Sequence, residues 1–221
     1  MTDKIAYRYS QVTAFLSMAA KQSTPTEKAI AVFRERGGIL RTSEALHLDI
    51  HPHTLYMLRE SGEIQQLSRG LYRLADLPPL SNADFVIVAR RIPQSVICLI
   101  SALAFHELTT QVPHAVHIAL PRGPRAPVLD YPPLRVYRFS GPAWSEGLDT
   151  HLIDSIPVRI YSAAKSVADC FKYRNKIGLD VALEALKNYR QRRDFDMDSL
   201  VKYSRVCRVE RVMHPYLEAL L

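Results

Sequence analysis

The sequence is poor in the residues that mark disulfide-rich, zinc-binding and membrane-spanning proteins. Its 221 residues include only 3 cysteines, 8 glycines and 1 tryptophan. Cys98, Cys170 and Cys207 form no C-x-x-C pair, which argues against a disulfide framework and against a cysteine zinc site. No stretch approaches ~18 consecutive apolar residues, and the N-terminus lacks the pattern of a secretory signal. We therefore expect a soluble, cytoplasmic protein with no membrane partner.

The motifs of common catalytic and cofactor-binding classes are also missing. The closest histidine pairs are His51-Pro-His53 and His114-x-x-His117, and neither completes a metal-binding motif. The sequence has no glycine-rich phosphate loop, and its acidic residues lack the spacing that a restriction-type nuclease needs. We predict that the protein has no metal, no cofactor and no enzymatic activity.

What the chain does have is a globular composition with an excess of positive charge. Apolar residues make up 48% and charged residues 23%, which excludes a disordered tail. The net charge of +7 suits an anionic partner. The excess is only +2 within residues 1–80 and +5 within residues 81–221. Net charge alone therefore gives weak support for binding of nucleic acid by the N-terminal part.

The pattern from residue 25 to residue 74 is typical of a winged helix-turn-helix. Thr24, Pro25 and Glu27 have the arrangement of a capping box with proline at the first helical position. The apolar residues that follow have helical spacing until a pair of glycines ends the helix. In the second helix, Ala45 and Leu46 are expected on the buried side. Two short helices in this order predict the start of a DNA-binding domain.

A third helix is expected over residues 52–61, with Leu55 and Leu58 in the core. At 100° per residue, the opposite face holds His53, Tyr56, Met57 and Glu60. Residues 64–74 follow as a hairpin, and Arg69 stands at its tip, where a wing contacts phosphate or a minor groove. Two glutamates near this helix would repel phosphate, and winged helices also serve as protein-docking modules. DNA binding is the favoured hypothesis and protein docking the alternative.

The remaining residues predict a second domain. Residues 1–24 form an N-terminal arm or short helix, residues 25–77 the winged helix-turn-helix, and residues 81–221 the second domain, with Pro78-Pro79 in the linker. The second domain is expected to begin with helices over residues 83–91 and 96–106. Three strands are then expected, at residues 116–120, 134–139 and 158–161, before further helices. Helices, a small sheet and C-terminal helices make a mixed domain of the α+β class.

A dense polar cluster lies in the helix expected after residue 162. Lys165, Asp169 and Lys172 are spaced i, i+4 and i+7, so one helix face holds all three and the acid can bridge the lysines. Arg174 and Lys176 extend the positive charge. A solvated helix face with modest ion pairing explains the cluster equally well.

In order and separation, four segments of the chain resemble the AbiEi family of antitoxins from bacterial type IV toxin–antitoxin systems. The segments are residues 38–42 (GILRT), 67–72 (LSRGLY), 100–109 (ISALAFHELT) and 164–178 (AKSVADCFKYRNKIG). The last is the most specific, and the likeness covers most of the chain beyond the first two dozen residues. The N-terminal arm and a third helix poor in arginine depart from the family's simplest pattern.

The resemblance implies a two-domain antitoxin. Its winged helix would bind inverted repeats in double-stranded promoter DNA as an autorepressor, and its second domain would neutralise a nucleotidyltransferase-type toxin, directly or indirectly. The expected DNA-binding residues are Arg41, Thr42, His51, His53, Thr54, Tyr56, Arg59 and Arg69. The expected antitoxin surface consists of Lys165, Asp169, Lys172, Arg174 and Lys176. The alternatives are a free-standing winged-helix regulator with a ligand-sensing C-terminal domain, a nuclease or nucleotidyl-transfer component, and a protein-binding adaptor.

Overall fold

The computed structural model describes residues 23–123 and 128–219, which form two compact units. The first unit ends at Leu77 and the second begins at Pro78, with the turn Leu67–Leu71 assigned to the second. The short helix expected in the N-terminal arm lies outside the described residues. No helix in the described ranges is both long and apolar enough to cross a membrane.

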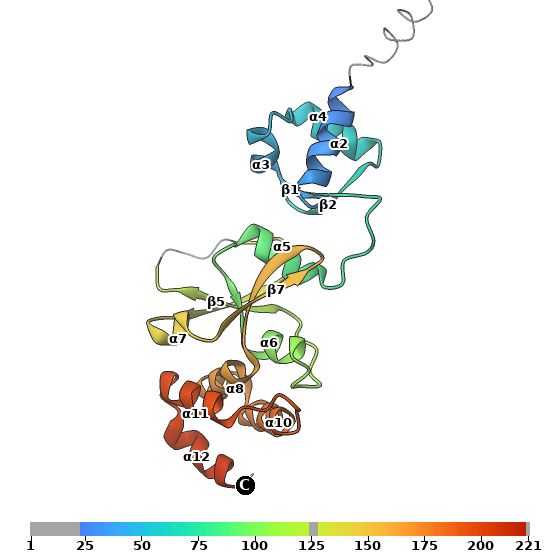
Figure 1. Cartoon of the computed structure of the whole chain (residues 1–221). Coiled ribbons are helices and arrows are strands. Elements are labelled where there is room, and N and C mark those ends of the chain that lie inside the picture. Colours follow the sequence, from blue (N-terminus) through green and yellow to red (C-terminus); the bar gives the residue numbers. More distant parts are fainter. Residues whose placement is uncertain (1–22, 124–127, 220–221) are drawn as a thin grey trace, which may run out of the picture. The chain divides into compact units, whose positions relative to one another are not determined.

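The first unit consists of three helices and a three-stranded sheet (Figure 1). Its elements are α2 (Pro25–Glu35), β1 (Ile39–Arg41), α3 (Thr42–His47), α4 (Pro52–Glu60), β2 (Ile64–Ser68) and β3 (Leu71–Leu74). The strands lie in the order β1-β3-β2. Strand β1 was not expected from the sequence. It adds a third strand beside the hairpin.

Local signals explain the start of this unit. The Thr24 hydroxyl accepts a hydrogen bond from the Glu27 N–H at 3.2 Å, and the Glu27 carboxylate accepts one from the Thr24 N–H at 2.8 Å. These two bonds form the predicted capping box and satisfy helix-terminal donors. Phe33, Leu55 and Leu58 are buried in one apolar cluster. Helices α2 and α4 are therefore held by a shared core.

The second unit contains a five-stranded mixed sheet and eight helices among the described residues. Its elements are α5 (Ala83–Arg91), β4 (Val96–Ile97), α6 (Leu99–Phe105), β5 (Val116–Pro121), β6 (Leu134–Phe139), α7 (Pro142–Ser145), β7 (Leu148–Ile153), β8 (Ile156–Tyr161), α8 (Ala163–Lys172), α9 (Arg174–Ile177), α10 (Leu179–Arg190), α11 (Met197–Val206) and α12 (Glu210–Glu218). The strand order is β6-β5-β4-β8-β7, with β5 parallel to β6 and β4 parallel to β8. Strands β4–β5 and β7–β8 pair antiparallel. The predicted α+β class is confirmed.

The sequence misplaced two elements of this sheet. The single helix expected over residues 96–106 is wrong, because Val96 and Ile97 form the central strand β4 and α6 begins only at Leu99. Leu99 has φ 48°, so the chain turns sharply between strand and helix. Strand β7 was missed because residues 148–153 include an aspartate, a threonine and a histidine and form an edge strand that is partly exposed.

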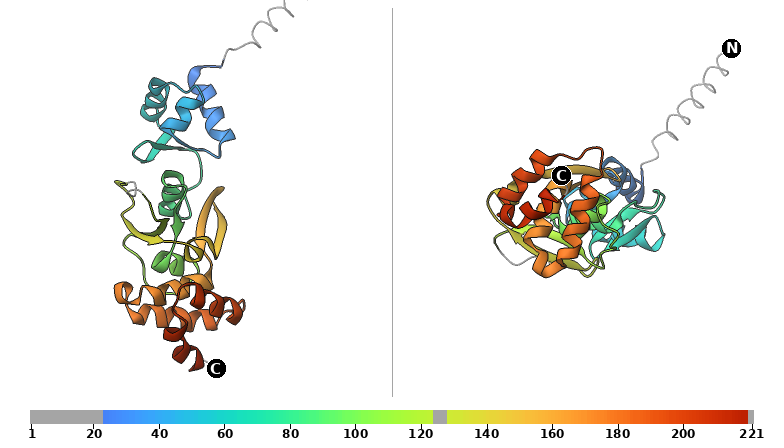
Figure 2. Two further views of the ribbon diagram at one scale, coloured as in Figure 1. Left: turned by 90° about the vertical axis from the view of Figure 1, so that its left-hand side faces the viewer. Right: turned by 90° about the horizontal axis from the view of Figure 1, so that it is seen from below.

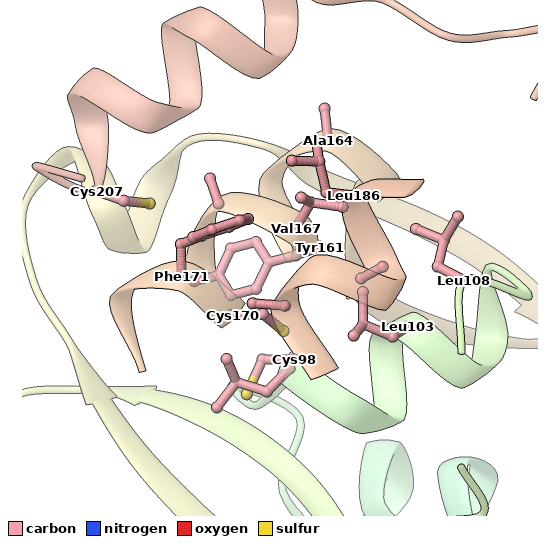
Figure 3. Packing of buried hydrophobic residues seen from close by; sticks show 14 of the residues in the cluster. Cys98, Leu103, Leu108, Tyr161, Ala164, Val167, Cys170, Phe171, Leu186 and Cys207 are labelled. Carbon is pink, nitrogen blue, oxygen red and sulfur yellow. The ribbon is translucent and has the colours of Figure 1, made fainter. Parts of the chain in front are cut away.

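The helices of the second unit cover the sheet in layers. Helix α5 packs against β8, and α6 and α8 pack against each other with α6 also on β5. Figure 2 shows α10, α11 and α12, in orange to red, gathered beyond α8 on the side of the sheet away from α5. A large apolar cluster joins α6, α8 and α10, including Cys98, Val167, Cys170, Phe171 and Leu186 (Figure 3). Helix α8 is thus the central helix of this unit.

Candidate functional site

The outward face of α4 is open to solvent. His51 caps the helix, because its Nδ1 accepts the N–H of His53 at 3.1 Å, and Pro52 occupies the first helical position. The four residues expected opposite Leu55 and Leu58 are all exposed: His53, Tyr56, Met57 and Glu60. Tyr56 is 53% exposed and Met57 46%, so both large side chains are accessible to a partner.

Arg59 lies beside this face. Its guanidinium lies 5.3 Å from the ring centroid of Tyr56 and donates to the Glu60 carboxylate at 3.0 Å. That bond raises the pKa of Arg59, so the side chain stays charged. Thr42, Tyr56 and Arg59 line one shallow hollow of about 140 Å³, together with Tyr72 of the hairpin. The structure therefore brings together three of the expected DNA-binding residues.

Other expected DNA-binding residues have different environments. Thr54 is buried, with 9% exposure, so the expectation that it contacts DNA is wrong: its position on α4 faces the helical core. Arg41 is half-buried and caps α3, where its N–H donates to the Glu44 carboxylate at 2.8 Å. Leu46, expected in the core, is 45% exposed. Arg69 is exposed at the turn between β2 and β3, where Gly70 has φ 70°.

Two residues of the expected antitoxin surface are not on the surface. Lys165 and Asp169 are 0% and 1% exposed, so neither belongs to a solvated helix face. The Lys165 Nζ lies 2.7 and 2.6 Å from the two carboxylate oxygens of Asp169, which is the i, i+4 pair expected from the spacing. Cys207 donates its thiol to the same carboxylate at 3.1 Å. Burial raises the pKa of Asp169, and the Lys165 ammonium opposes that shift.

Tertiary packing explains why this pair is buried. The ammonium of Lys165 lies 4.2 Å from the ring centroid of Tyr161 and 5.0 Å from that of Phe139. Gly147, with φ +71°, comes so close that a Cβ there would lie 2.8 Å from the Cβ of Lys165. Sheet residues and the end of α11 therefore enclose the face of α8 that was expected to be exposed to solvent.

The other expected residues of this surface are accessible to different degrees. Lys172 and Lys176 are exposed, and Arg174 is half-buried with its guanidinium donating to the Phe171 carbonyl at 2.8 Å. Lys172 lines a cleft of about 420 Å³. Arg122, Arg138 and Arg208 also line the cleft, and no spacing pattern links them because they come from separate segments.

Of the histidine pair at residues 114 and 117, His117 lies in strand β5 and His114 lies in the loop before it. His114 is exposed, whereas His117 is 3% exposed and its backbone N–H donates to the Ser101 hydroxyl at 2.9 Å. Within the described ranges, no three His, Cys, Asp or Glu side chains group as a metal site. Burial, with a smaller effect of the neighbouring Arg135, lowers the pKa of His117 to about 4. The imidazole is therefore neutral in the folded protein at neutral pH.

This pKa predicts acid sensitivity. Between pH 6.5 and about 4, the unfolded chain takes up a proton at His117 and the folded protein does not, so stability falls as the pH falls. The contribution is about 2–3 kcal/mol of unfolding free energy. In chemical denaturation across this range, His117→Gln should lose less stability than the parent. His114→Gln, at the exposed histidine, should behave like the parent; equal acid sensitivity of parent and His117→Gln would contradict the prediction.

Comparisons with known proteins agree with the resemblance. No curated protein sequence matches the chain. A crystal structure of the Rv2827c protein from Mycobacterium tuberculosis is similar, with a TM-score of 0.55 and 14% identity, over 87% of this chain and 72% of that one. At this identity the likeness shows a shared fold. Residues 27–75 match the family model described as a transcriptional regulator, AbiEi antitoxin. Over these residues the resemblance to the AbiEi antitoxin family is confirmed.

Proposed function

We propose that the protein is an antitoxin of a type IV toxin–antitoxin system and acts in the bacterial cytoplasm. Residues 25–77 bind inverted repeats in the promoter of their own operon as a repressor. Residues 81–221 neutralise a nucleotidyltransferase-type toxin, directly or indirectly, and the protein has no catalytic activity of its own. The observation that carries the proposal is that the segment matching the antitoxin regulators is also the winged helix whose third helix has an exposed face.

The chemistry of that face supports binding to a DNA groove. His53 and Tyr56 lie in the first half of α4, the part of a recognition helix that meets base edges in this class of domain. The Arg59 guanidinium has donors beyond the one bonded to Glu60, which leaves it able to contact phosphate. Arg69 at the exposed hairpin turn supplies a second cation. These few cations give a modest affinity per monomer, so two copies on an inverted repeat are part of the proposal.

Loss of the wing cation should weaken DNA binding without changing its specificity. Arg69→Ala removes one phosphate contact, so the slope of log affinity against log salt should become shallower by about one unit. Tyr56→Ala should instead reduce the difference in binding free energy between operator DNA and random DNA by about 1–3 kcal/mol. Gel shifts with the upstream DNA of the operon, repeated at several salt concentrations, measure both effects.

Arg34→Ala is the matched control within residues 25–77. Arg34 is exposed, and its guanidinium already pairs with Asp76 at 2.8 Å. It should change neither the salt slope nor the preference for operator DNA. A slope that stays the same in Arg69→Ala would remove the wing assignment. A complete lack of binding at low salt would favour the protein-docking role of the winged helix.

A further inference from the structure

The cleft of the second unit has a distinctive lining. Its volume is about 420 Å³, within the range of ~300–1,000 Å³ that is usual for small-molecule sites. Strand β6 with its flanks, helix α8 and the end of α11 all contribute to the walls. Four cationic side chains line the cleft: Arg122, Arg138, Lys172 and Arg208. Positively charged residues far apart in the sequence therefore lie around one cleft.

Little negative charge offsets three of these cations, Arg122, Lys172 and Arg208, whereas the guanidinium of Arg138 already donates to the Pro121 carbonyl at 2.8 Å. Asp169 is the single acid among the described lining residues, and its carboxylate already holds the buried ammonium of Lys165. Within the described ranges, Arg122, Lys172 and Arg208 have no carboxylate within salt-bridge distance, whereas the exposed Arg205 and the half-buried Arg192 each pair with one. Holding several like charges around a hollow is unfavourable unless an anion occupies it.

A helix-ending turn places Arg208 at the cleft. Arg208 has φ 58°, and it follows the C-cap residue Cys207 at the position where helices usually place glycine. The Val209 N–H returns to the Ser204 carbonyl at 2.8 Å, which is the bond of such a helix-ending turn. The thiol of Cys207 anchors the turn on Asp169. The turn therefore fixes the backbone of Arg208 at the rim of the cleft.

The lining also selects the class of ligand. Arginine forks match the oxygens of phosphate groups, and three separate arginines with a lysine suit an anion with more than one charged group. Tyr173 lines the same cleft, and its hydroxyl, whose pKa burial raises to about 12, donates to the Arg138 carbonyl at 3.5 Å. We propose that this cleft binds a small polyphosphate, either free or as the phosphate chain of a nucleoside di- or triphosphate. Neither DNA binding nor toxin neutralisation is needed for this binding.

Two variants test the site while sparing the fold. Arg208→Gly removes a charge where the backbone conformation favours glycine, so its melting temperature should equal or exceed that of the parent. Lys172→Gln removes a charge from an exposed side chain. Each should weaken binding about tenfold, the expected loss of a charge-assisted hydrogen bond. Lys187→Gln, an exposed lysine of α10 outside the cleft, gives the same change in net charge and should bind like the parent.

Calorimetric titration of the full chain with tripolyphosphate, GTP, ATP and citrate measures the affinities. Stronger binding of the nucleotides than of tripolyphosphate identifies a nucleotide site, and equal binding identifies a site for the phosphate chain alone. Arg69→Ala should leave these affinities unchanged, which separates the cleft from DNA binding by the wing. The proposal is overturned if no polyphosphate binds, if citrate binds as strongly as tripolyphosphate, or if both cleft variants bind like the parent. It is also overturned if those variants weaken only binding to duplex DNA.

Discussion

Replacing Asp169 with asparagine should destabilise the second unit by about 3–5 kcal/mol, because the buried ammonium of Lys165 would lose its counter-charge. The wild-type pair is held by contacts of 2.7 and 2.6 Å, and the two side chains are 0% and 2% exposed. Asparagine keeps the shape of the side chain but not its charge. Chemical denaturation followed by circular dichroism measures the loss.

A double variant separates the charge from the packing. Lys165→Met with Asp169→Leu removes both charges and fills similar volume, so its stability should return to near the parent value or exceed it. If the aspartate-to-asparagine variant alone were as stable as the parent, Lys165 would have to be neutral or hydrated, and the buried ion pair would be the wrong description. Exposed pairs such as Arg205 with Glu210 should cost less than ~1 kcal/mol when broken, which gives the contrast.

The same pair shows where sequence reasoning stops. The i, i+4 spacing predicted that Lys165 and Asp169 would meet, and they do. It did not predict burial, because the covering residues, Gly147 and Cys207, lie far away in the sequence. One local signal was available, because residues 164–171 contain only these two charged side chains. Such a composition is typical of a helix covered on every side, and all eight residues are buried in the structure.

The first unit was easier to predict because its signals are local. The capping box at Thr24 and the positions of Leu55 and Leu58 follow from spacing along one helix. Strand β1 was missed because three residues are too few to show an alternating pattern. The cleft was missed for a different reason: cations such as Arg122 and Arg208 meet only through the tertiary fold, and no spacing rule links them.

Replacing Phe33 with alanine should unfold the first unit and separate the two activities. Phe33 is 0% exposed and packs in the cluster that holds α2 against α4, so its loss costs about 3–5 kcal/mol. A domain of this size has a total stability of only ~3–8 kcal/mol, so a loss of this size cancels most of it and leaves a large fraction of molecules with the first unit unfolded. DNA binding and repression should then disappear. Polyphosphate binding and growth rescue on co-expression with the gene of the proposed toxin should persist, because we propose that both depend on the second unit alone.

Phe33→Leu is the control, since a smaller change in core volume costs less than ~1.5 kcal/mol and should preserve both activities. Gel shifts report on the first unit, and hydrogen exchange at strand β8 reports whether the second unit is still folded. If Phe33→Ala abolished growth rescue while β8 stayed protected, neutralisation would require the winged helix, and the proposed division of labour would be wrong. Retained operator binding by Phe33→Ala would instead show that the cluster around Phe33 does not support the DNA-binding face.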